Sequence, residues 1–526
     1  MFEVTRSRGT QGLRRVACVC VIVLTACAAL PEHVERSPSS AYSTPTETNL
    51  GRTAAEAAAL RAGQSGFLVL DSGKDALLER LALIESAERS IDLQYYIWNS
   101  DSTGRYMAAR VYAAAERGVR VRILLDDMNT SGRDAVLAFL DSHPAIEVRI
   151  YNPIAARSGV GRLFGFARDF SRANRRMHNK SLTADGAATI VGGRNIGDEY
   201  FDASAELNFL DRDLLSVGPV VAQVEEAFDV FWNSPWAYPI ASLTKTTLTP
   251  EEAAARRTGA IHAGEELAQR GFHPVHERLP GQAHFAATLK QLVWAPARLV
   301  HDVPPVDGDV SNTSTVQAVA HALAEIAGSA QHEVLIESAY FILGDPALER
   351  FAQLKANGVR LRALTNSLAS NDLATNHSGY ARRREQMLKS GIELHELRPD
   401  AASCQVLVSN RCGDGAAFGL HSKSAVFDRR IVYVGSFNVN LRSAYLNTET
   451  ALIIESPALA EQVAKSIEEN MREENSWRVE LDEKGHLRWV TARDGVEEIS
   501  THEPATGLWR RFQVGFYKLF PVEKYL

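Results

Sequence analysis

The chain has 526 residues, which are too many for a single ordinary hydrophobic core, so its length favours two or three domains. Hydrophobic residues make up 45% of the chain and charged residues 23%, a globular composition that excludes a disordered chain, a collagen-like repeat and a small disulfide scaffold. The formal net charge of -7 argues against a protein that coats nucleic acid, which is usually basic, but leaves room for a local basic cleft.

The N-terminus has the pattern of an export signal. An Arg-containing segment precedes an apolar run over residues 16–26, which is too short to span a bilayer, and Cys27 follows the run. Residues 24–27, Leu-Thr-Ala-Cys, resemble a bacterial lipobox, which predicts cleavage before Cys27 and lipidation of its thiol. A plain signal peptide with an incidental cysteine is the alternative. Ala28 after the cysteine resembles lipoproteins sent to the outer membrane, and residues 1–27 are assigned to the signal.

The next segment, residues 28–54, is rich in Ser, Thr and Pro, and this composition predicts a flexible tether. No later stretch reaches the roughly 18 consecutive apolar residues of a membrane span, so we expect a soluble body held at a membrane by its lipid. The predicted location is periplasmic, with the protein lipid-anchored to the outer membrane of a bacterium.

A long-period duplication organises most of the remaining chain. Three strand-like runs in the first half have echoes in the second half: residues 90–97, 118–124 and 146–149 are echoed by residues 334–342, 358–364 and 392–395. Helical patterns lie between these runs, so the alternation predicts two α/β domains with largely parallel sheets. We place the domains at residues 55–245 and 286–475.

Two further segments complete the predicted organisation. Residues 246–285 are rich in Ala, Glu and Arg and predict a helical insertion or linker. Residues 476–526 predict a hairpin, with Asp-Glu-Lys-Gly at 482–485 as its turn, followed by an amphipathic C-terminal segment.

The cysteines and histidines outside these features predict a cross-link and no metal site. Cys404 and Cys412 lie eight residues apart in an exported chain, which predicts a disulfide that closes a short loop; two free thiols are the alternative. No Cys/His spacing resembles a zinc site, since His273 and His276 lack further ligands, and we expect neither a metal nor a cofactor.

The strongest chemical signal is a motif that occurs twice, at a constant offset of 243 residues from 178 to 421. Both copies read His-x-Lys-x4-Asp followed by Gly-x-x-Asn: His178, Lys180, Asp185, Gly192 and Asn195, and His421, Lys423, Asp428, Gly435 and Asn438. Two such copies inside a wider repeat favour a duplicated active site over two structural histidines. The two aspartates end their strands and are candidates either for catalysis or for turn formation.

The spacing also indicates the chemistry. A strand period of two puts each histidine and its lysine on one face, so a reactive nitrogen lies beside a fixed positive charge. That pairing suits a phosphodiester, whose transition state spreads negative charge over its oxygens. With both motifs at a domain interface, one histidine attacks phosphorus and the other protonates the leaving oxygen. The donors expected for the phosphate oxygens are Asn195, Ser436 and Asn438, with Gly193 standing opposite Ser436.

Each histidine needs an acceptor for its second ring nitrogen, and this acceptor is usually a carboxylate. Glu449, which opens an apolar strand, is the candidate in the second half and is expected to orient His421. Strand alignment places Asp211 opposite Glu449, so Asp211 is expected to orient His178. Counting from the histidine without gaps gives Glu206 instead.

These motifs are similar to those of the phospholipase D superfamily, and residues 91–97, 176–180, 435–438 and 508–523 resemble bacterial cardiolipin synthases of the C-type branch. The resemblance implies two pseudo-symmetric phospholipase D-like domains, each a mixed sheet flanked by helices, with the active site at their interface. It also implies that a phosphatidyl group passes through a phosphohistidine to the glycerol head group of a second phospholipid, making cardiolipin from phosphatidylglycerol. His178 would be the nucleophile and His421 the general acid, although spacing alone allows the exchanged roles.

Two segments have the composition of a lipid-facing surface. Aromatic and basic residues recur over 161–176 and 508–520, which favours interfacial segments that draw anionic lipid toward the site. An ordinary amphipathic helix and a core-docking terminal helix are the alternatives. The expected partners are therefore phospholipid substrates at a membrane surface and no nucleic acid, with any accessory protein left open.

Three activities fit these residues. Cardiolipin synthesis is preferred, and a hydrolytic phospholipase D would use the same residues with water as acceptor to give phosphatidic acid. An exported phosphodiesterase or nuclease is the third, although the nuclease branch usually has one motif per chain and a basic balance. A scaffold without activity is disfavoured because both copies keep His, Lys and Asn.

Overall fold

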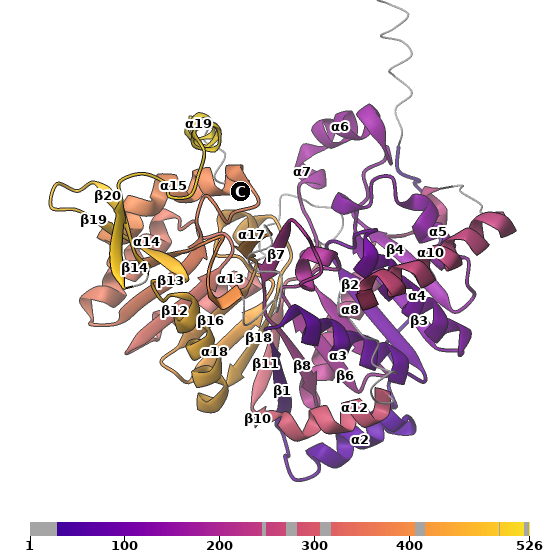
Figure 1. The fold of residues 1–526 in the computed structure, drawn as a ribbon. Helices are drawn as coiled ribbons and strands as arrows, with labels where there is room; N and C mark the ends of the chain where they lie inside the picture. The colour runs from indigo at the N-terminus through magenta and orange to yellow at the C-terminus, as the bar shows by residue number, and fades with distance from the viewer. Residues whose placement is uncertain are drawn as a thin grey trace, which may run out of the picture.

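The computed structural model describes residues 29–244, 249–269, 281–305, 317–404, 416–493, 495–519 and 525. Two helix-flanked sheets lie side by side, with the first half of the chain in one and the second half in the other (Figure 1). This arrangement confirms the predicted pair of α/β domains. Cys27 and the rest of the predicted signal lie outside the described residues.

The first sheet has the strand order β10-β1-β8-β6-β5-β2-β3-β4-β9. Only the pairs β2–β3 and β3–β4 of this sheet are parallel, and its other pairs are antiparallel, so the largely parallel sheet expected from the alternation is wrong and the mixed sheet is confirmed. A tight hairpin, not a crossover helix, joins β5 to β6, because Asp185 and Gly186 adopt positive φ values of 54° and 59°. The strands are β1 (Ser65–Leu70), β2 (Ser90–Tyr95), β3 (Arg120–Asp126), β4 (Ile146–Tyr151), β5 (Ser181–Ala184), β6 (Ala188–Gly192), β8 (Asp213–Val217), β9 (Ala237–Pro239) and β10 (Val293–Ala295).

The second sheet repeats this plan in the order β11-β18-β17-β16-β12-β13-β14-β19-β20-β21. Its parallel core is β12, β13 and β14, and the predicted C-terminal hairpin, formed by β19 and β20, extends the sheet through β19. The second domain therefore continues past its predicted end at residue 475. The strands are β11 (Ala297–His301), β12 (Glu333–Ser338), β13 (Arg360–Asn366), β14 (Ile392–Leu397), β16 (Lys423–Phe427), β17 (Ile431–Gly435), β18 (Thr450–Glu455), β19 (Ser476–Leu481), β20 (Leu487–Arg493) and β21 (Val496–Ser500).

Helices cover both sheets, and α8 and α18 join strands of the two domains in one hydrophobic cluster. The main helices are α3 (Gly73–Ser86), α4 (Ser102–Glu116), α5 (Asp134–Asp141), α6 (Gly159–Arg168), α7 (Phe170–Ala173), α8 (Pro219–Trp232), α9 (Ile240–Leu243), α13 (Ala318–Gly328), α14 (Asp345–Ala356), α15 (Ala374–Lys389), α17 (Leu441–Tyr445), α18 (Pro457–Asn470) and α19 (Leu508–Tyr517). None of the helices in the described ranges combines the length and apolar character that crossing a bilayer requires.

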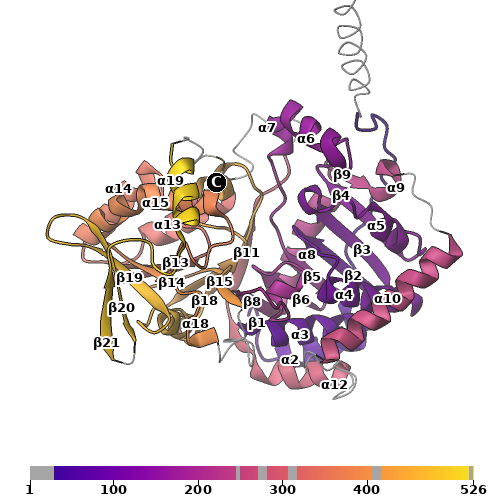
Figure 2. The ribbon, with the colours of Figure 1, turned by 45° about the horizontal axis from the view of Figure 1, so that its top comes forward.

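The change from the first sheet to the second falls at Pro296 rather than at the predicted residue 286. β10 pairs with β1 of the first sheet, whereas β11 pairs with β18 of the second. Two helices of the predicted linker belong to the shell of the first domain: α10 (Pro250–Gln269) contacts α4 and α12 (Gly281–Thr288) contacts α3. Figure 2 shows α10 along the outer side of this domain.

The segment before the first domain is docked on that domain, so the flexible tether predicted over residues 28–54 is wrong for its later part. Arg36 donates hydrogen bonds to the carbonyl oxygens of Ala237 and Pro235, both at 2.9 Å, and the N–H of Ala41 donates to the Asp229 carboxylate at 2.8 Å. Thr48 then starts α2 (Asn49–Ala58), because its hydroxyl accepts a hydrogen bond from the Gly51 N–H and caps the helix. The polar residues that suggest a solvated chain bond to the protein instead.

A buried arginine also joins the two domains. Arg212, only 1% exposed, lies 2.6 Å from the Asp71 carboxylate of the first domain and 2.6 Å from the Glu337 carboxylate of the second. It further donates to the hydroxyls of Ser424 at 2.6 Å and Ser466 at 2.8 Å. Among the described residues, Arg212 is the only cation that forms an ion pair with the buried Glu337 carboxylate.

We therefore expect Arg212→Ala to lower the free energy of unfolding by about 3–5 kcal/mol, because it leaves the buried Glu337 carboxylate without its ion-pair partner. Urea denaturation followed by circular dichroism measures this loss. The matched control is Arg430→Ala, which removes an exposed partner 3.8 Å from Glu455 and should cost less than about 1 kcal/mol. Equal losses in the two variants would contradict the assignment of Arg212 as the ionic link between domains.

Candidate active site

Each motif histidine stands just before an antiparallel hairpin of its own sheet. His178 precedes β5 and His421 precedes β16, and both side chains are buried. The hairpins return along β6 and β17, which end at Gly192 and Gly435. Glycine is required there because a Cβ on Gly435 would lie 2.1 Å from the Thr450 carbonyl oxygen.

Each histidine receives its carboxylate from the opposite half of the chain. His178 Nδ1 lies 2.9 Å from Glu449 Oε2, and His421 Nδ1 lies 2.7 Å from Asp211 Oδ2. The expected pairs, Glu449 with His421 and Asp211 with His178, are therefore wrong, although both acids do orient a histidine. Both carboxylates are fully buried. Glu206, the alternative, is exposed.

Backbone pairing across the interface explains the exchange. β7 (Leu207–Leu210) runs parallel to β15 (Ala417–Leu420), so the residues that follow them, Asp211 and His421, lie side by side. Met177 forms a parallel bridge with Thr448, which brings His178 beside Glu449 in the same way. Asp211 and Glu449 are equivalent in the repeat, as the strand alignment predicts, but each serves the other motif.

The carboxylates fix the tautomer of both imidazoles. Each accepts the proton on Nδ1, which leaves the lone pair on Nε2 free. Burial lowers the pKa of His178 to about 4 and that of His421 to about 3, although the carboxylates raise both values. Both rings are therefore neutral near pH 7 and present an unprotonated nitrogen. The negative charge of a bound phosphodiester would favour protonation of one of them.

The two lysines bring the motifs into one electrostatic unit. Burial lowers the pKa of Lys180 to about 7 and that of Lys423 to about 8. Lys180 Nζ donates to the His178 carbonyl oxygen at 2.5 Å, and Lys423 Nζ lies 3.1 Å from His421 Nδ1. Lys423 also lowers the pKa of His178, and Lys180 that of His421, so the two motifs share a single site.

The predicted phosphate-binding residues differ in their freedom to donate. Asn195 Oδ1 accepts from the Ile97 N–H at 3.1 Å, while its buried Nδ2 makes no hydrogen bond of good geometry to the described protein. Asn438 Oδ1 is also buried without such a bond, but an amide oxygen accepts and cannot donate to a phosphate. Ser436 Oγ instead donates to Glu449 at 2.5 Å, so its expected role as a phosphate donor is corrected to one of holding the carboxylate. Its counterpart is Gly193, where a Cβ would lie 2.1 Å from Asp211.

The two motif aspartates lie away from the histidines, at the far ends of β5 and β16. Their positive φ values, 54° for Asp185 and 51° for Asp428, fit the turn that begins each hairpin. Each carboxylate accepts three backbone N–H groups, at residues 88–90 for Asp185 and 331–333 for Asp428, at 2.7 to 2.9 Å. The structure thus corrects their expected catalytic role to one of turn formation.

The motif pattern gives no sign of the aromatic and basic groups around the histidines. Tyr96 contacts the His178 ring edge-on with centroids 5.0 Å apart, and Tyr200 contacts the His421 ring at 5.1 Å. Arg442 on α17 donates to Asn174 Oδ1 at 2.9 Å, and its charge lowers the pKa of Tyr96 against the larger effect of burial. The one sequence signal for these groups is the pair of tyrosines at the end of β2, which precedes the contact of Tyr96 with His178.

The remaining predicted sites are partly outside the described residues. Cys404 is disulfide-bonded, whereas Cys412, His273 and His276 are not described. Within the described ranges no three His, Cys, Asp or Glu side chains gather as a metal site would require.

Comparisons with known proteins bear on the family and the fold of the chain. The family described as "Cardiolipin synthase, PLD-like domain" matches residues 81–232 and 323–471. Cardiolipin synthase C of Escherichia coli (strain K12) is 39% identical over 464 residues, which are 88% of this chain and 96% of that protein. Cardiolipin synthase B of the same strain is 24% identical over 388 residues, 73% of this chain and 75% of that protein. The crystal structure of phosphatidylserine synthase from Haemophilus influenzae Rd KW20 shares the fold, with a TM-score of 0.54 and 14% identity over 90% of this chain and 100% of that one.

The exchanged carboxylates can be tested by nitrogen NMR of histidine-labelled protein. Glu449→Gln replaces the charged carboxylate beside His178 with a neutral amide, so the imidazole shifts of His178 should change while those of His421 stay in place. Asp211→Asn should give the reverse pattern. Glu206→Gln is the control and should move neither ring. Shifts of His421 in Glu449→Gln would restore the pairing within each half.

Proposed function

The chain belongs to the cardiolipin synthase family of phospholipase D-like proteins and is a phosphatidyltransferase; we propose that it makes cardiolipin from phosphatidylglycerol and a second phospholipid. The observation that carries the proposal is the site itself. Two buried histidines, each held by a carboxylate of the opposite half, provide the nucleophile and the acid that transfer between two lipids needs.

The reaction proceeds in two displacements. When the donor lipid binds, the negative charge of its phosphodiester favours protonation of His421 on Nε2. His178 Nε2 attacks the phosphorus of that lipid, the bond to the head-group oxygen breaks, and the oxygen takes the Nε2 proton from His421. The glycerol hydroxyl of phosphatidylglycerol then gives its proton to His421 and attacks the phosphorus, which releases His178. Lys180, Lys423 and the Asn195 amide support both steps by facing the negative oxygens. The assignment of nucleophile and acid follows the family resemblance, because the two half-sites are nearly symmetric.

The substrates lie in a membrane, and one side of the molecule suits that surface. Figures 1 and 2 show α6 of the first domain and α19 of the second on the same side, flanking the region where the domains meet. Exposed apolar side chains concentrate on these helices: Val160, Leu163 and Phe164 on α6, and Leu508, Trp509, Phe512 and Phe516 on α19. A lipid on Cys27 would hold this side against the periplasmic face of the outer membrane.

Purified protein incubated with phosphatidylglycerol, with and without phosphatidylethanolamine, should produce cardiolipin detectable by mass spectrometry. His178→Asn and His421→Asn should each reduce the rate by about 10³-fold or more. His486→Asn, an exposed histidine on the C-terminal hairpin, is the control and should keep full activity. Phosphatidic acid as the sole product would favour a hydrolytic phospholipase D instead. DNA cleavage without any lipid product would favour the nuclease alternative.

Removal of the exposed aromatics of α19 should weaken binding to lipid vesicles. In a chain carrying Cys27→Ser, which excludes any anchor, Trp509→Ser with Phe512→Ser should reduce co-sedimentation with phosphatidylglycerol vesicles at least about tenfold. Leu60→Ser is the control, because Leu60 is 95% exposed and follows α2 on the opposite side of the molecule (Figure 1). Equal binding by both variants would exclude α19 as a membrane contact.

A further inference from the structure

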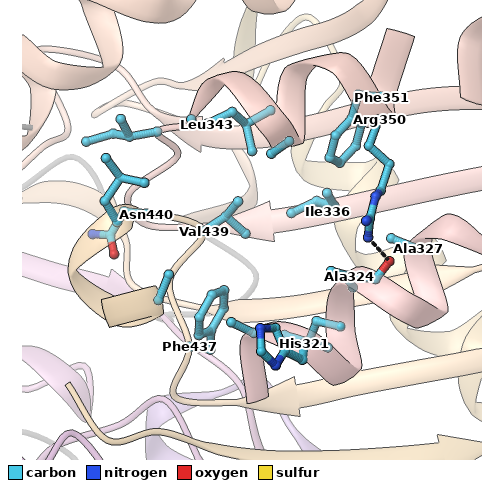
Figure 3. Close-up of a pocket in the computed structure, with 18 of the residues that line it drawn as sticks. His321, Ala324, Ala327, Ile336, Leu343, Arg350, Phe351, Phe437, Val439 and Asn440 are labelled. Atoms are coloured by element: carbon cyan, nitrogen blue, oxygen red, sulfur yellow. Dashed lines mark hydrogen bonds between the residues drawn. The ribbon is translucent and has the colours of Figure 1, made fainter. Parts of the chain in front are cut away.

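The second domain contains an apolar pocket of about 370 Å³ beside its helical layer. Side chains from α13, α14, β12 and the loop after β17 line it, including Ile336, Leu343, Phe351 and Val439 (Figure 3). Arg350 crosses from α14 at one end and donates to the Ala324 carbonyl oxygen at 3.0 Å, so its charge is directed away from the apolar walls. This volume lies in the range of pockets that hold small apolar ligands.

On one helix of the second half, side chains that line the pocket are smaller than their counterparts in the first half. The offset of 243 residues holds here, since Asp185 accepts from the Ser90 N–H and Asp428 from the Glu333 N–H. It pairs three buried residues of α3 with three pocket-lining residues of α13: Leu77, Leu81 and Ile84 with Ala320, Ala324 and Ala327. The first half therefore shows that this fold accepts larger side chains at these helix positions.

The pocket shares a wall with the active site. Along the loop after β17, Ser436 contacts the Glu449 carboxylate, whereas its neighbour Phe437 lines the pocket. α17 has the same double role, because Leu441 and Tyr445 line the pocket while Arg442 contacts Asn174 of the first domain. The loop after β17 and the short helix α17 therefore contact both the pocket and the residues that support the active site.

The opening of the pocket is exposed to solvent. His321 on α13, Pro346 on α14 and Tyr445 at the end of α17 all line the pocket and are exposed. Tyr445 lies on the side of the pocket that borders the domain interface through α17. An extended apolar group could therefore enter here while a polar group joined to it stays near the interface.

From this geometry we propose that the pocket binds one acyl chain of the phospholipid whose head group enters the site between the domains. The inference rests on the proposed lipid substrate and deepens it, because it names a second binding element of that substrate. Mostly apolar walls suit a hydrocarbon chain, and the charged side chains of the lining have partners: Glu337 pairs with Arg212, and Arg350 donates to the Ala324 carbonyl oxygen. Binding of the chain away from the phosphorus would favour long-chain substrates without altering the chemical step.

The first test locates the acyl chain directly. Full-length protein is irradiated with vesicles of phosphatidylglycerol that carries a diazirine on one acyl chain, and the cross-linked peptides are identified by mass spectrometry. We expect cross-links within residues 317–354 and 437–445. Ala320→Leu with Ala324→Leu restores the side chains of the first half, fills the pocket and should reduce these cross-links at least tenfold. Ala318→Leu, at an exposed position of the same helix, should leave them unchanged.

The second test compares transfer rates with dihexanoyl and dioleoyl phosphatidylglycerol. The filled variant should lose at least tenfold with the dioleoyl lipid and keep its rate with the dihexanoyl lipid, because neither alanine touches the histidines. Thermal melting checks that the variant folds, and the single variants Ala320→Leu and Ala324→Leu replace it if it does not melt cooperatively.

The outcomes separate this inference from the proposed function. Cross-links confined to other segments, or equal loss with both lipids in a folded variant, would overturn the acyl-chain assignment even if cardiolipin is made. Cross-links in the pocket that filling removes would sustain the assignment even if the wild-type protein makes no cardiolipin, in which case the proposed product alone fails.

Discussion

The hydrogen bond between a buried histidine and a buried carboxylate of the opposite domain is the contact on which the site depends. It fixes the imidazole tautomer, keeps a carboxylate ionised inside the protein and exposes Nε2 to the shared space. Because both bonds cross the interface, neither domain holds a complete half-site. The Arg212 link and the hydrophobic cluster between the sheets therefore contribute to chemistry as well as to stability, since they hold each histidine against its acid.

This reciprocal arrangement is what a two-fold symmetric pair of identical subunits would produce, because residue i then contacts residue j and j contacts i. Covalent joining of the two copies allows them to diverge. Ser436 supports the longer Glu449, whereas Gly193 leaves room for the shorter Asp211. Ala320 and Ala324 open a space that Leu77 and Leu81 close in the other copy. One half can thus specialise in holding lipid while the reactive groups remain nearly symmetric.

Much of this could be predicted from the sequence, because the strongest signals are local. The spacing of His178 and Lys180, and its recurrence in the second half, located the reactive groups and the two domains. The partner of each carboxylate could not be predicted, because the pairing of β7 with β15 joins distant residues and leaves no periodic signal. The docked N-terminal segment was missed for a similar reason: Arg36 bonds to carbonyl oxygens about 200 positions away, and composition reports only the polarity of the segment.

The docked N-terminal segment also limits the distance between a lipid on Cys27 and the folded domains. Only nine positions separate Cys27 from Arg36, and so short a stretch reaches roughly 30 Å even when fully extended. An acyl group on Cys27 would be a membrane anchor with a short connection to the folded domains, and it would keep the protein on the leaflet that carries this anchor. Both the donor lipid and the acceptor lipid would then come from that leaflet. The rate of transfer would depend on the local concentration of these lipids rather than on diffusion of the protein between membranes.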